Sequence, residues 1–357
     1  MKKRALLLTN HMIGFTGSEL VVIEIAEALN ARGWSSEIRC NLLGDIIARA
    51  CLDISISDSL EYDLGDFDLI WVQHDLISAK METLRSKTKA PLIVYASLSP
   101  FEPFEFPDLF AIGHLGAPLF VNSKETALAI FGRGTNIRSI EIFYNAAPDH
   151  FFRKNSANPK ATLERLLIIS NHVPSELFDS IRLFEENQVS CSVVGIQGKY
   201  ERVTPELILD SDAVITIGKS VQYCIASKRP VFMYDAFGSG GWLTDVNFNE
   251  ALSKNFSGRH LGERLSAEEI FSEVTRGFME STLFINSIDH HFDLNVFRLG
   301  YYVDQLCAAA SNHAGMAAFR DNLQRAFGDA SFNSHVAFSS ARQQIIRREY
   351  RKNRDSA

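Results

Sequence analysis

A nine-residue stretch in the second half of the chain contains a Gly-Lys-Ser triplet that could bind phosphate. This stretch, "AVITIGKSV" at residues 213–221, fits the pattern of a P-loop, in which backbone N–H groups wrap a nucleotide phosphate. The four residues before Gly218 should then form a loop, but residues 214–217 are all β-branched, which favours a strand. We therefore expect a strand that ends at Gly218, and nucleotide hydrolysis is the lesser alternative.

The Gly-Lys-Ser triplet could still bind an anion, although it does not belong to a P-loop. The segment "KSVQYCIAS" predicts a helix that begins directly after Gly218, and the first turn of a helix attracts phosphate through its N–H groups and its dipole. Lys219 adds a positive charge and Ser220 adds a hydroxyl donor. The backbone amides from Gly218 to Val221 would also donate to the phosphate. We predict a phosphate-binding turn over residues 218–221. The alternative is a tight turn with an exposed lysine.

Short apolar runs recur along the chain, with helix-compatible segments between them, and predict an α/β fold. Each run is typical of a buried parallel strand. The runs lie at residues 5–10, 68–74, 91–98, 118–123, 163–170, 189–195, 212–218 and 230–236. The pattern predicts two doubly wound, Rossmann-like domains that face a central cleft, followed by a helical C-terminal extension.

A polar segment, "RKNSANPKAT" at residues 153–162, is typical of a linker between two domains. We expect an N-terminal domain over residues 1–155 and a second domain over 156–290. Residues 267–311 have a mostly helical pattern, and we expect C-terminal helices and a basic tail over residues 291–357.

The composition excludes several classes of protein. Hydrophobic residues make up 46% of the chain and charged residues 22%, as in ordinary globular proteins. The net charge of -7 argues against a general nucleic-acid binder, and the chain has no apolar run of about 18 residues that could span a membrane. The basic segment 341–357 could make a weak peripheral contact with anionic lipid, or it could be a frayed helix end.

Five scattered cysteines without a Cys-x-x-Cys pair indicate reduced thiols in a cytosolic protein. His290 and His291 lack a third ligand at metal spacing, so we expect no metal site. Glu102 and Glu105 could suggest a glycosidase, but nothing in the sequence sets their separation across a sugar.

Four segments occur in a characteristic order: "GFTGSELVVIEIAEALNARG", "LFVNSKETALAIFG", "IEIFYNAAPDHFF" and "DAVITIGKSVQYCIASKRPVFMYDAFGSGGWLT". In this order they resemble the GT-B glycosyltransferases, above all the large bacterial family 4 and related polysaccharide-biosynthesis enzymes. The resemblance implies a nucleoside-diphosphate-sugar in the second domain and a glycan or related acceptor in the first. It also implies transfer without metal or cofactor, and retention of the anomeric configuration.

On the donor side, the resemblance points to the phosphate turn and the neighbouring strand ends. Lys219 would balance the charge that develops on the leaving diphosphate, and Trp242 could stack on the nucleotide or sugar. The family usually has a Gly-Arg pair and a lysine, where this chain has "SNHVPSE". The donor-binding candidates are His172, Gly195, Gly218, Lys219, Ser220, Val221, Tyr223, Asp235, Gly238, Gly240 and Trp242.

On the acceptor side, the candidates lie at or after the ends of two strands of the first domain. They are Gly14, Phe15, Thr16, Gly17, Ser97, Ser99 and Glu102. Thr16 and Glu19 also match a capping box, which explains both without a ligand. His74 ends a strand and could orient or deprotonate an acceptor hydroxyl, so it is the second catalytic candidate beside Lys219. The alternative for His74 is a structural histidine.

Two departures from the family pattern keep other functions open. Many family 4 enzymes have two glutamates around the donor helix, and neither is present, since the second should fall near Tyr223. The family histidine would align near Ser97. A catalytically degenerate protein that binds a glycan or nucleotide-sugar, or acts as a scaffold, is therefore the main alternative to a transferase. A nucleotide-sugar epimerase or hydrolase is the third.

Overall fold

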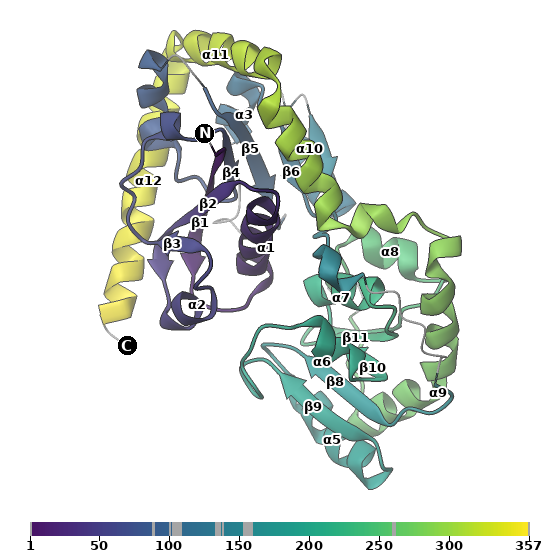
Figure 1. The fold of residues 1–357 in the computed structure, drawn as a ribbon. Helices are drawn as coiled ribbons and strands as arrows, with labels where there is room; N and C mark the ends of the chain where they lie inside the picture. Colours follow the sequence, from purple (N-terminus) through teal and green to yellow (C-terminus); the bar gives the residue numbers. More distant parts are fainter. Residues whose placement is uncertain are drawn as a thin grey trace. The chain divides into compact units, whose positions relative to one another are not determined.

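The computed structural model describes residues 2–87, 90–99, 101, 109–132, 137, 139–152, 160–258 and 262–355 (Figure 1). The chain divides into two compact units. Unit 1 comprises Met1–Phe143 and Gly300–Ala357, and unit 2 comprises Tyr144–Leu299. The boundary thus lies ahead of the polar segment 153–162, most of which is outside the described residues.

Unit 1 is built on a parallel sheet in the order β3-β2-β1-β4-β5-β6-β7. Its strands are β1 (Arg4–Met12), β2 (Ser35–Leu43), β3 (Ser55–Ser57), β4 (Leu69–Val72), β5 (Leu92–Ser97), β6 (Leu119–Val121) and β7 (Ile140–Ile142). The four apolar runs predicted here became β1, β4, β5 and β6, whereas β2, β3 and β7 were not predicted. The chain moves from β1 to β2 on one side and returns to β4 on the other. The loops after β1 and β4 therefore flank a topological switch point, where α/β proteins bind ligands.

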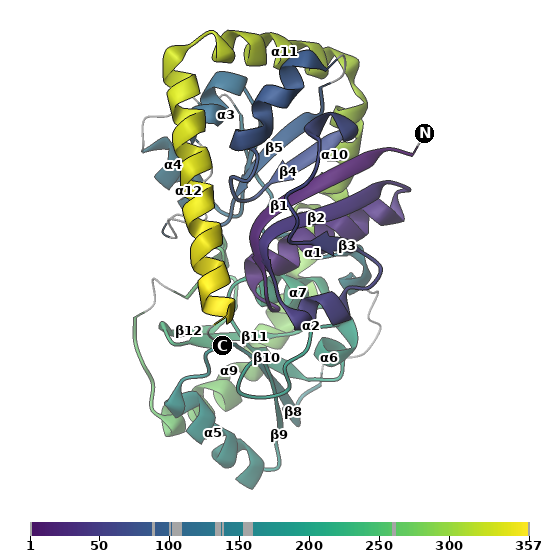
Figure 2. The same cartoon turned by 90° about the vertical axis from the view of Figure 1, so that its left-hand side faces the viewer.

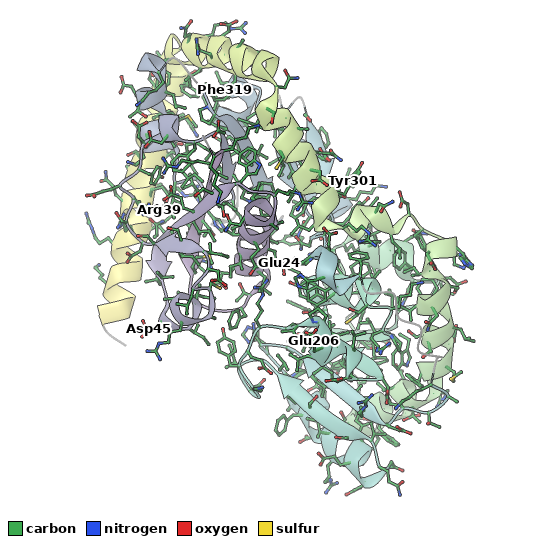
Figure 3. All side chains as sticks on the ribbon, in the orientation of Figure 1. Glu24, Arg39, Asp45, Glu206, Tyr301 and Phe319 are labelled. Atoms are coloured by element: carbon green, nitrogen blue, oxygen red, sulfur yellow. The ribbon has the colours of Figure 1, made fainter. Side chains whose placement is uncertain are left out.

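Helices cover both faces of this sheet. They are α1 (Gly17–Ala31), α2 (Asp45–Ala50), α3 (Leu109–Leu115), α4 (Lys124–Phe131), α10 (Leu299–Ser311), α11 (His313–Phe327) and α12 (Ala330–Asp355), with 3₁₀ turns η1 (Leu64–Asp66) and η2 (Ser78–Ser86). The C-terminal helices share the core of the sheet, since Phe319 and Leu323 of α11 and Phe332 of α12 are buried with residues of β4 and β5. Figure 3 labels Phe319 on α11.

The last helix, α12, packs along unit 1 against η2, α3 and β2 (yellow in Figures 1 and 2). Ser339 Oγ donates to the buried carboxylate of Asp75 at 2.5 Å. One turn further on, Gln343 Oε1 accepts from Asn41 Nδ2 at 3.1 Å. The predicted helical C-terminal extension is confirmed, and these bonds tie it to residues at the carboxyl ends of β4 and β2.

Unit 2 contains a second sheet in the order β12-β11-β10-β8-β9. Its strands are β8 (Arg165–Ile169), β9 (Ser190–Val194), β10 (Ala213–Ile215), β11 (Val231–Asp235) and β12 (Gly238–Trp242). The four predicted strands are confirmed and pair in parallel, while β12, which was interpreted as a loop, adds an antiparallel edge. The switch point of this sheet lies between β8 and β10.

The helices of unit 2 complete a second Rossmann-like layer structure. They are α5 (Ser175–Glu186), α6 (Pro205–Leu209), α7 (Lys219–Ala226), α8 (Phe248–Ser253) and α9 (Ala267–Ser287), with 3₁₀ turns η4 (Asp149–Phe151), η5 (Ile288–His290) and η6 (Leu294–Phe297). The helical pattern predicted for residues 267–311 appears as α9 and α10, and the turns η5 and η6 interrupt it.

Candidate functional site

The carboxyl ends of β8 and β10 form the switch point of unit 2. Thr216 Oγ1 donates to the carbonyl of Ile169 at 2.8 Å, which ties the loops after the two strands together. Gly218 then donates its backbone N–H to the carbonyl of Phe256 at 2.7 Å, and α7 begins at the next residue. The predicted order of strand, glycine and helix is confirmed, but β10 ends at Ile215 instead of continuing to Gly218, and Thr216 and Ile217 lie between the strand and the glycine.

Gly218 leaves open space at the first turn of α7. It has φ 63° and ψ -137°, and a Cβ atom built on it meets nothing within 4 Å. Of the four predicted amides, Gly218 donates to Phe256, and Val221 donates to the Gly218 carbonyl at 3.0 Å. The amides of Lys219 and Ser220 belong to the first turn of α7, whose N–H groups point toward the N-terminal end of the helix. With the helix dipole, this turn favours an anion.

The side chain of Lys219 points along α7 into the protein. It is 6% exposed, and its ammonium donates to the carbonyls of Asn145 at 3.2 Å and Ala146 at 3.4 Å. The Nζ atom lies 5.1 Å from the centre of the Tyr223 ring, one helical turn further on. The alternative of an exposed lysine is therefore wrong. A contact between Lys219 and a phosphate stays a prediction.

A buried polar cluster surrounds this ammonium. Gln222 Nε2 donates to the Tyr144 carbonyl at 3.0 Å and to Asn255 Oδ1 at 3.1 Å, and Asn145 Nδ2 donates to the same Asn255 oxygen at 3.1 Å. Tyr144, Asn145 and Asn255 have left-handed backbones. Among the described residues, the buried oxygens Asn145 Oδ1, Gln222 Oε1 and Ser257 Oγ have no hydrogen-bond partner. Such oxygens are expected to bind water or a polar ligand.

The ends of β8, β9 and β11 meet beside this turn. Ser170 Oγ donates to Asp235 Oδ2 at 3.0 Å and accepts the backbone N–H of His172 at 3.0 Å. Gly195 has φ 139°, and a Cβ there would lie 1.9 Å from the Ser170 carbonyl oxygen. Packing thus explains Gly195, and Asp235 is engaged by Ser170. The His172 side chain is exposed at this edge.

Two aromatic donor candidates belong to the core instead. Trp242 is buried, and its indole N–H donates to the carbonyls of Glu273 and Val274 on α9 at 3.1 and 3.2 Å. Tyr223 is fully buried and stacks on Phe151, with ring centres 4.3 Å apart. The expectation that Trp242 stacks on a nucleotide or sugar is therefore wrong, because α9 already covers its ring.

The two glycine candidates of the β11–β12 hairpin have structural explanations. Gly238 has φ 103°, and a Cβ on it would lie 2.6 Å from the Glu263 carbonyl oxygen. The Gly240 carbonyl accepts from Asn247 Nδ2 at 3.1 Å. These contacts need no ligand.

Phe237 is a further candidate site residue, which the sequence did not indicate. Its side chain follows β11 and is 51% exposed. A Cβ on Gly258 would lie 4.0 Å from Phe237 Cβ and 3.4 Å from Ile217 Cγ2, so Phe237 stands beside the residue that precedes Gly218. An aromatic side chain directly after a parallel strand was the available signal. An open ring at this edge can stack on a planar ligand.

In unit 1, the loop after β1 is held by an internal carboxylate. Glu19 accepts the backbone N–H groups of Ile13 at 2.6 Å, Gly14 at 3.0 Å and Thr16 at 3.1 Å, and the Thr16 hydroxyl at 2.6 Å. The predicted capping box is confirmed. Because these N–H groups and the hydroxyl already donate to Glu19, they are not available to bind an anion. Phe15 is half-buried and Gly17 is exposed.

His74 lies at the switch point of unit 1, directly after β4. Its Nδ1 lies 3.0 Å from both the Asn10 backbone N–H and the Thr9 hydroxyl. A backbone N–H only donates, so Nδ1 accepts, and the neutral ring carries its hydrogen on Nε2. That Nε2 is buried without a partner among the described residues. Burial lowers the pKa of His74 to about 3, helped by His11 and Arg342. His74 is therefore neutral at neutral pH and a weak base.

The remaining acceptor candidates follow β5, which pairs with β4. Ser97 is buried and its hydroxyl donates to the Ser99 carbonyl at 3.4 Å, while Ser99 Oγ accepts the Phe101 N–H at 3.2 Å. Glu102 lies outside the described residues. The structure thus brings the loop after β1, His74, Ser97 and Ser99 to one edge of the first sheet.

The described part of the chain contains neither a metal-binding cluster nor a membrane-spanning helix. No group of three or more His, Cys, Asp or Glu residues there could hold a metal ion. None of its helices has the length and apolar character needed to cross a bilayer. The structure pairs none of the five cysteines in a disulfide.

No family model matches the chain, and no curated protein matches it. Solved structures match over most of its length. HepE from Anabaena, in complex with UDP and glucose, is 16% identical, with a TM-score of 0.51 over 87% of this chain and 99% of that one. A glycosyltransferase from Rickettsia africae is 12% identical, with a TM-score of 0.55 over 87% and 98%. A putative UDP-N-acetylglucosamine 2-epimerase from Listeria monocytogenes is 14% identical, with a TM-score of 0.50 over 88% and 97%. The chain therefore has the GT-B fold.

Replacing Gly195 by alanine should be far more damaging than the same change at Gly218. A methyl at Gly195 would overlap the Ser170 carbonyl, whereas at Gly218 only the left-handed backbone opposes it. We expect Gly195→Ala to lower the free energy of unfolding by roughly 3 kcal/mol or more and Gly218→Ala by about 1–2 kcal/mol. Urea unfolding measures both, and equal losses would contradict the packing role of Gly195.

His74 should make the protein less stable in mild acid. Between its folded pKa of about 3 and its ordinary value of 6.5, the unfolded state binds a proton that the native state does not, so stability falls as the pH drops below 6.5. At pH 5 this amounts to about 2 kcal/mol from this group. Urea unfolding of wild type and His74→Asn at pH 7 and pH 5 should show a smaller loss in the variant. An equal loss would mean that His74 is protonated normally.

Proposed function

We propose that the chain is a glycosyltransferase that moves a sugar from a nucleoside-diphosphate-sugar to a glycan or related acceptor. The observation that carries this proposal is the open first turn of α7 after Gly218, at the switch point of the second sheet. The fold supports it, and because HepE was solved with UDP and glucose, a UDP-sugar is the first donor to test. We place the reaction in bacterial surface polysaccharide synthesis in the cytoplasm, without a metal and with retention of configuration.

The donor's diphosphate would bind at residues 218–221. Negative charge builds on the leaving phosphate oxygen as the glycosidic bond loosens, so N–H donors and positive charge lower the barrier. The amides of Lys219 and Ser220 and the half-exposed Ser220 hydroxyl are the proposed ligands. The Lys219 ammonium would act from inside α7, where the carbonyls of Asn145 and Ala146 hold it.

The nucleoside would lie against Phe237. The exposed His172 would border the same site. A base ring stacked on an aromatic side chain gains affinity whatever its hydrogen-bonding pattern. Phe237 therefore replaces Trp242 as the proposed stacking residue.

The acceptor would bind at the carboxyl edge of the first sheet. There, His74 follows β4, while Ser97 ends the neighbouring strand β5 and Ser99 follows it. Since the pKa of His74 is lowered to about 3, we propose that its neutral Nε2–H orients an acceptor oxygen by donating a hydrogen bond. A role as the general base is not part of this proposal.

The burial of His74 also favours a second candidate function. A protein of this fold without an effective base, and without the two glutamates of the resembling family, would bind a nucleotide-sugar or glycan without turning it over.

A thermal-shift screen over nucleoside-diphosphate-sugars identifies the donor, because a ligand that binds the folded state raises the melting temperature of the protein. Turnover with acceptors then supports the transferase. Binding without turnover supports the second candidate, and turnover without acceptor supports an epimerase or hydrolase.

Lys219→Met should weaken binding of the donor through its phosphates. Methionine keeps the apolar stem but removes the charge, so we expect a loss of about 1–3 kcal/mol for a nucleoside diphosphate in calorimetry. The nucleoside alone should be affected much less, which separates a phosphate role from a structural one. Lys228→Met, which removes an ion pair with Asp289 beyond the end of α7, is the control. Unchanged diphosphate affinity would refute the phosphate role.

Phe237→Ala should weaken the nucleoside and the nucleotide equally. Loss of the stacked ring is expected to cost about 1–3 kcal/mol of affinity for both ligands, and Phe237→Tyr should retain it. Phe178→Ala is the matched control, since Phe178 on α5 is 52% exposed against 51% for Phe237. Calorimetry that finds the same affinity in wild type and Phe237→Ala would remove Phe237 from the site.

A further inference from the structure

The outer face of α12 carries large apolar side chains that are mostly exposed. Phe338 is 68% exposed and Ile345 59% exposed, and Ala341 between them is also exposed. Residues three, four and seven positions apart lie on one side of a helix. We call Phe338, Ala341, Ile345 and the exposed Arg348 the outer face of α12.

The opposite side of α12 already binds unit 1. Phe332, Ser339 and Ile346 are buried there, at 0%, 5% and 6% exposure. A surface helix that only covers a core carries polar residues on its other side. The outer face departs from this rule over two turns, so unit 1 itself does not account for Phe338 and Ile345.

Positive charge is concentrated on the same helix. Six basic side chains and two acidic ones, Glu349 and Asp355, give α12 a formal charge of +4. The whole chain carries -7, which leaves -11 for the remaining residues. Near an anionic surface, this asymmetry attracts α12 and repels the rest of the chain.

We propose that the outer face of α12 docks on the surface of an anionic lipid bilayer. Phe338 and Ile345 enter the boundary between headgroups and acyl chains, while the exposed Arg348 and Lys352 stay among the lipid phosphates. This combination of apolar and basic residues along one helix is what interfacial helices use. The surface is separate from the proposed sugar chemistry and does not depend on it.

Other occupants fit the outer face less well. A second copy of the chain would have to bury an interface of about 800 Å² per partner, and this face offers two large apolar side chains. Nucleic acid would match the charge of α12, but it would leave Phe338 and Ile345 without an apolar environment. Lipid satisfies both features.

Sedimentation of the full chain with vesicles tests this proposal. Wild type should bind vesicles of phosphatidylcholine with about one third phosphatidylglycerol, and pure phosphatidylcholine vesicles much less. The double variant Phe338→Ser/Ile345→Ser should lower the partition coefficient about tenfold or more. The matched control is Leu128→Ser/Phe131→Ser on α4, whose side chains are 60% and 55% exposed. It should bind like wild type.

A charge variant tests the electrostatic part of the proposed binding to lipid. Arg348→Glu should weaken binding to the anionic vesicles and reduce the dependence of binding on salt. Arg182→Glu on the exposed side of α5 makes the same change in net charge and should leave vesicle binding unchanged. All four variants should keep the wild-type melting temperature, because every substituted side chain is exposed.

Three results would overturn the proposal. The first is wild type that stays in solution with anionic vesicles. The second is equal vesicle binding by the α12 and α4 double variants. The third is a wild-type dimer in light scattering that the Phe338→Ser/Ile345→Ser variant converts to a monomer, because this would assign the face to a second copy.

Discussion

A buried carboxylate, that of Glu19, holds the loop after β1 in the first unit. Parallel strands end at one edge of a sheet, and the loop after β1 must turn there into α1 with its N–H groups satisfied. Glu19 accepts three of these N–H groups and a hydroxyl. The negative charge that such a loop attracts is therefore supplied by a side chain of the protein itself. Among the groups at this edge of unit 1, the neutral His74 and Ser97 suit hydroxyls better than phosphates.

In the second unit, the helix that follows β10 begins without an acidic residue in its first turn. The loop after β10 satisfies Gly218 and Val221 through the backbone and enters α7 with its first turn open. Two sheets of similar topology thus have switch points of different character. One is suited to a neutral, hydroxyl-rich molecule and the other to an anion. The proposed transfer from a diphosphate-linked sugar to a hydroxyl acceptor would use this difference.

The sequence was sufficient where local patterns decide the structure. Continuous apolar runs identified eight parallel strands, and β-branched residues before Gly218 excluded a P-loop. The strand β2, "SSEIRCNLL", alternates polar and apolar residues, and the glycine-rich β12 looks like a loop, so both escaped prediction. Contacts between distant residues were beyond reach. Nothing near Trp242 reveals that α9 covers it, and nothing near Phe237 reveals that its ring stays open.

Lys219 is the case in which a structural role and an electrostatic role are compatible. Its contacts with Asn145 and Ala146 are to neutral carbonyls, which fix the position of the ammonium without cancelling its charge. A charge one turn inside a helix acts on an anion at the first turn through protein of low effective dielectric, where it is screened less than in water. The same ammonium can therefore hold the left-handed turn at Asn145 and raise the positive potential at Gly218. A direct bond to phosphate would do only the second, and would leave the two carbonyls without a donor.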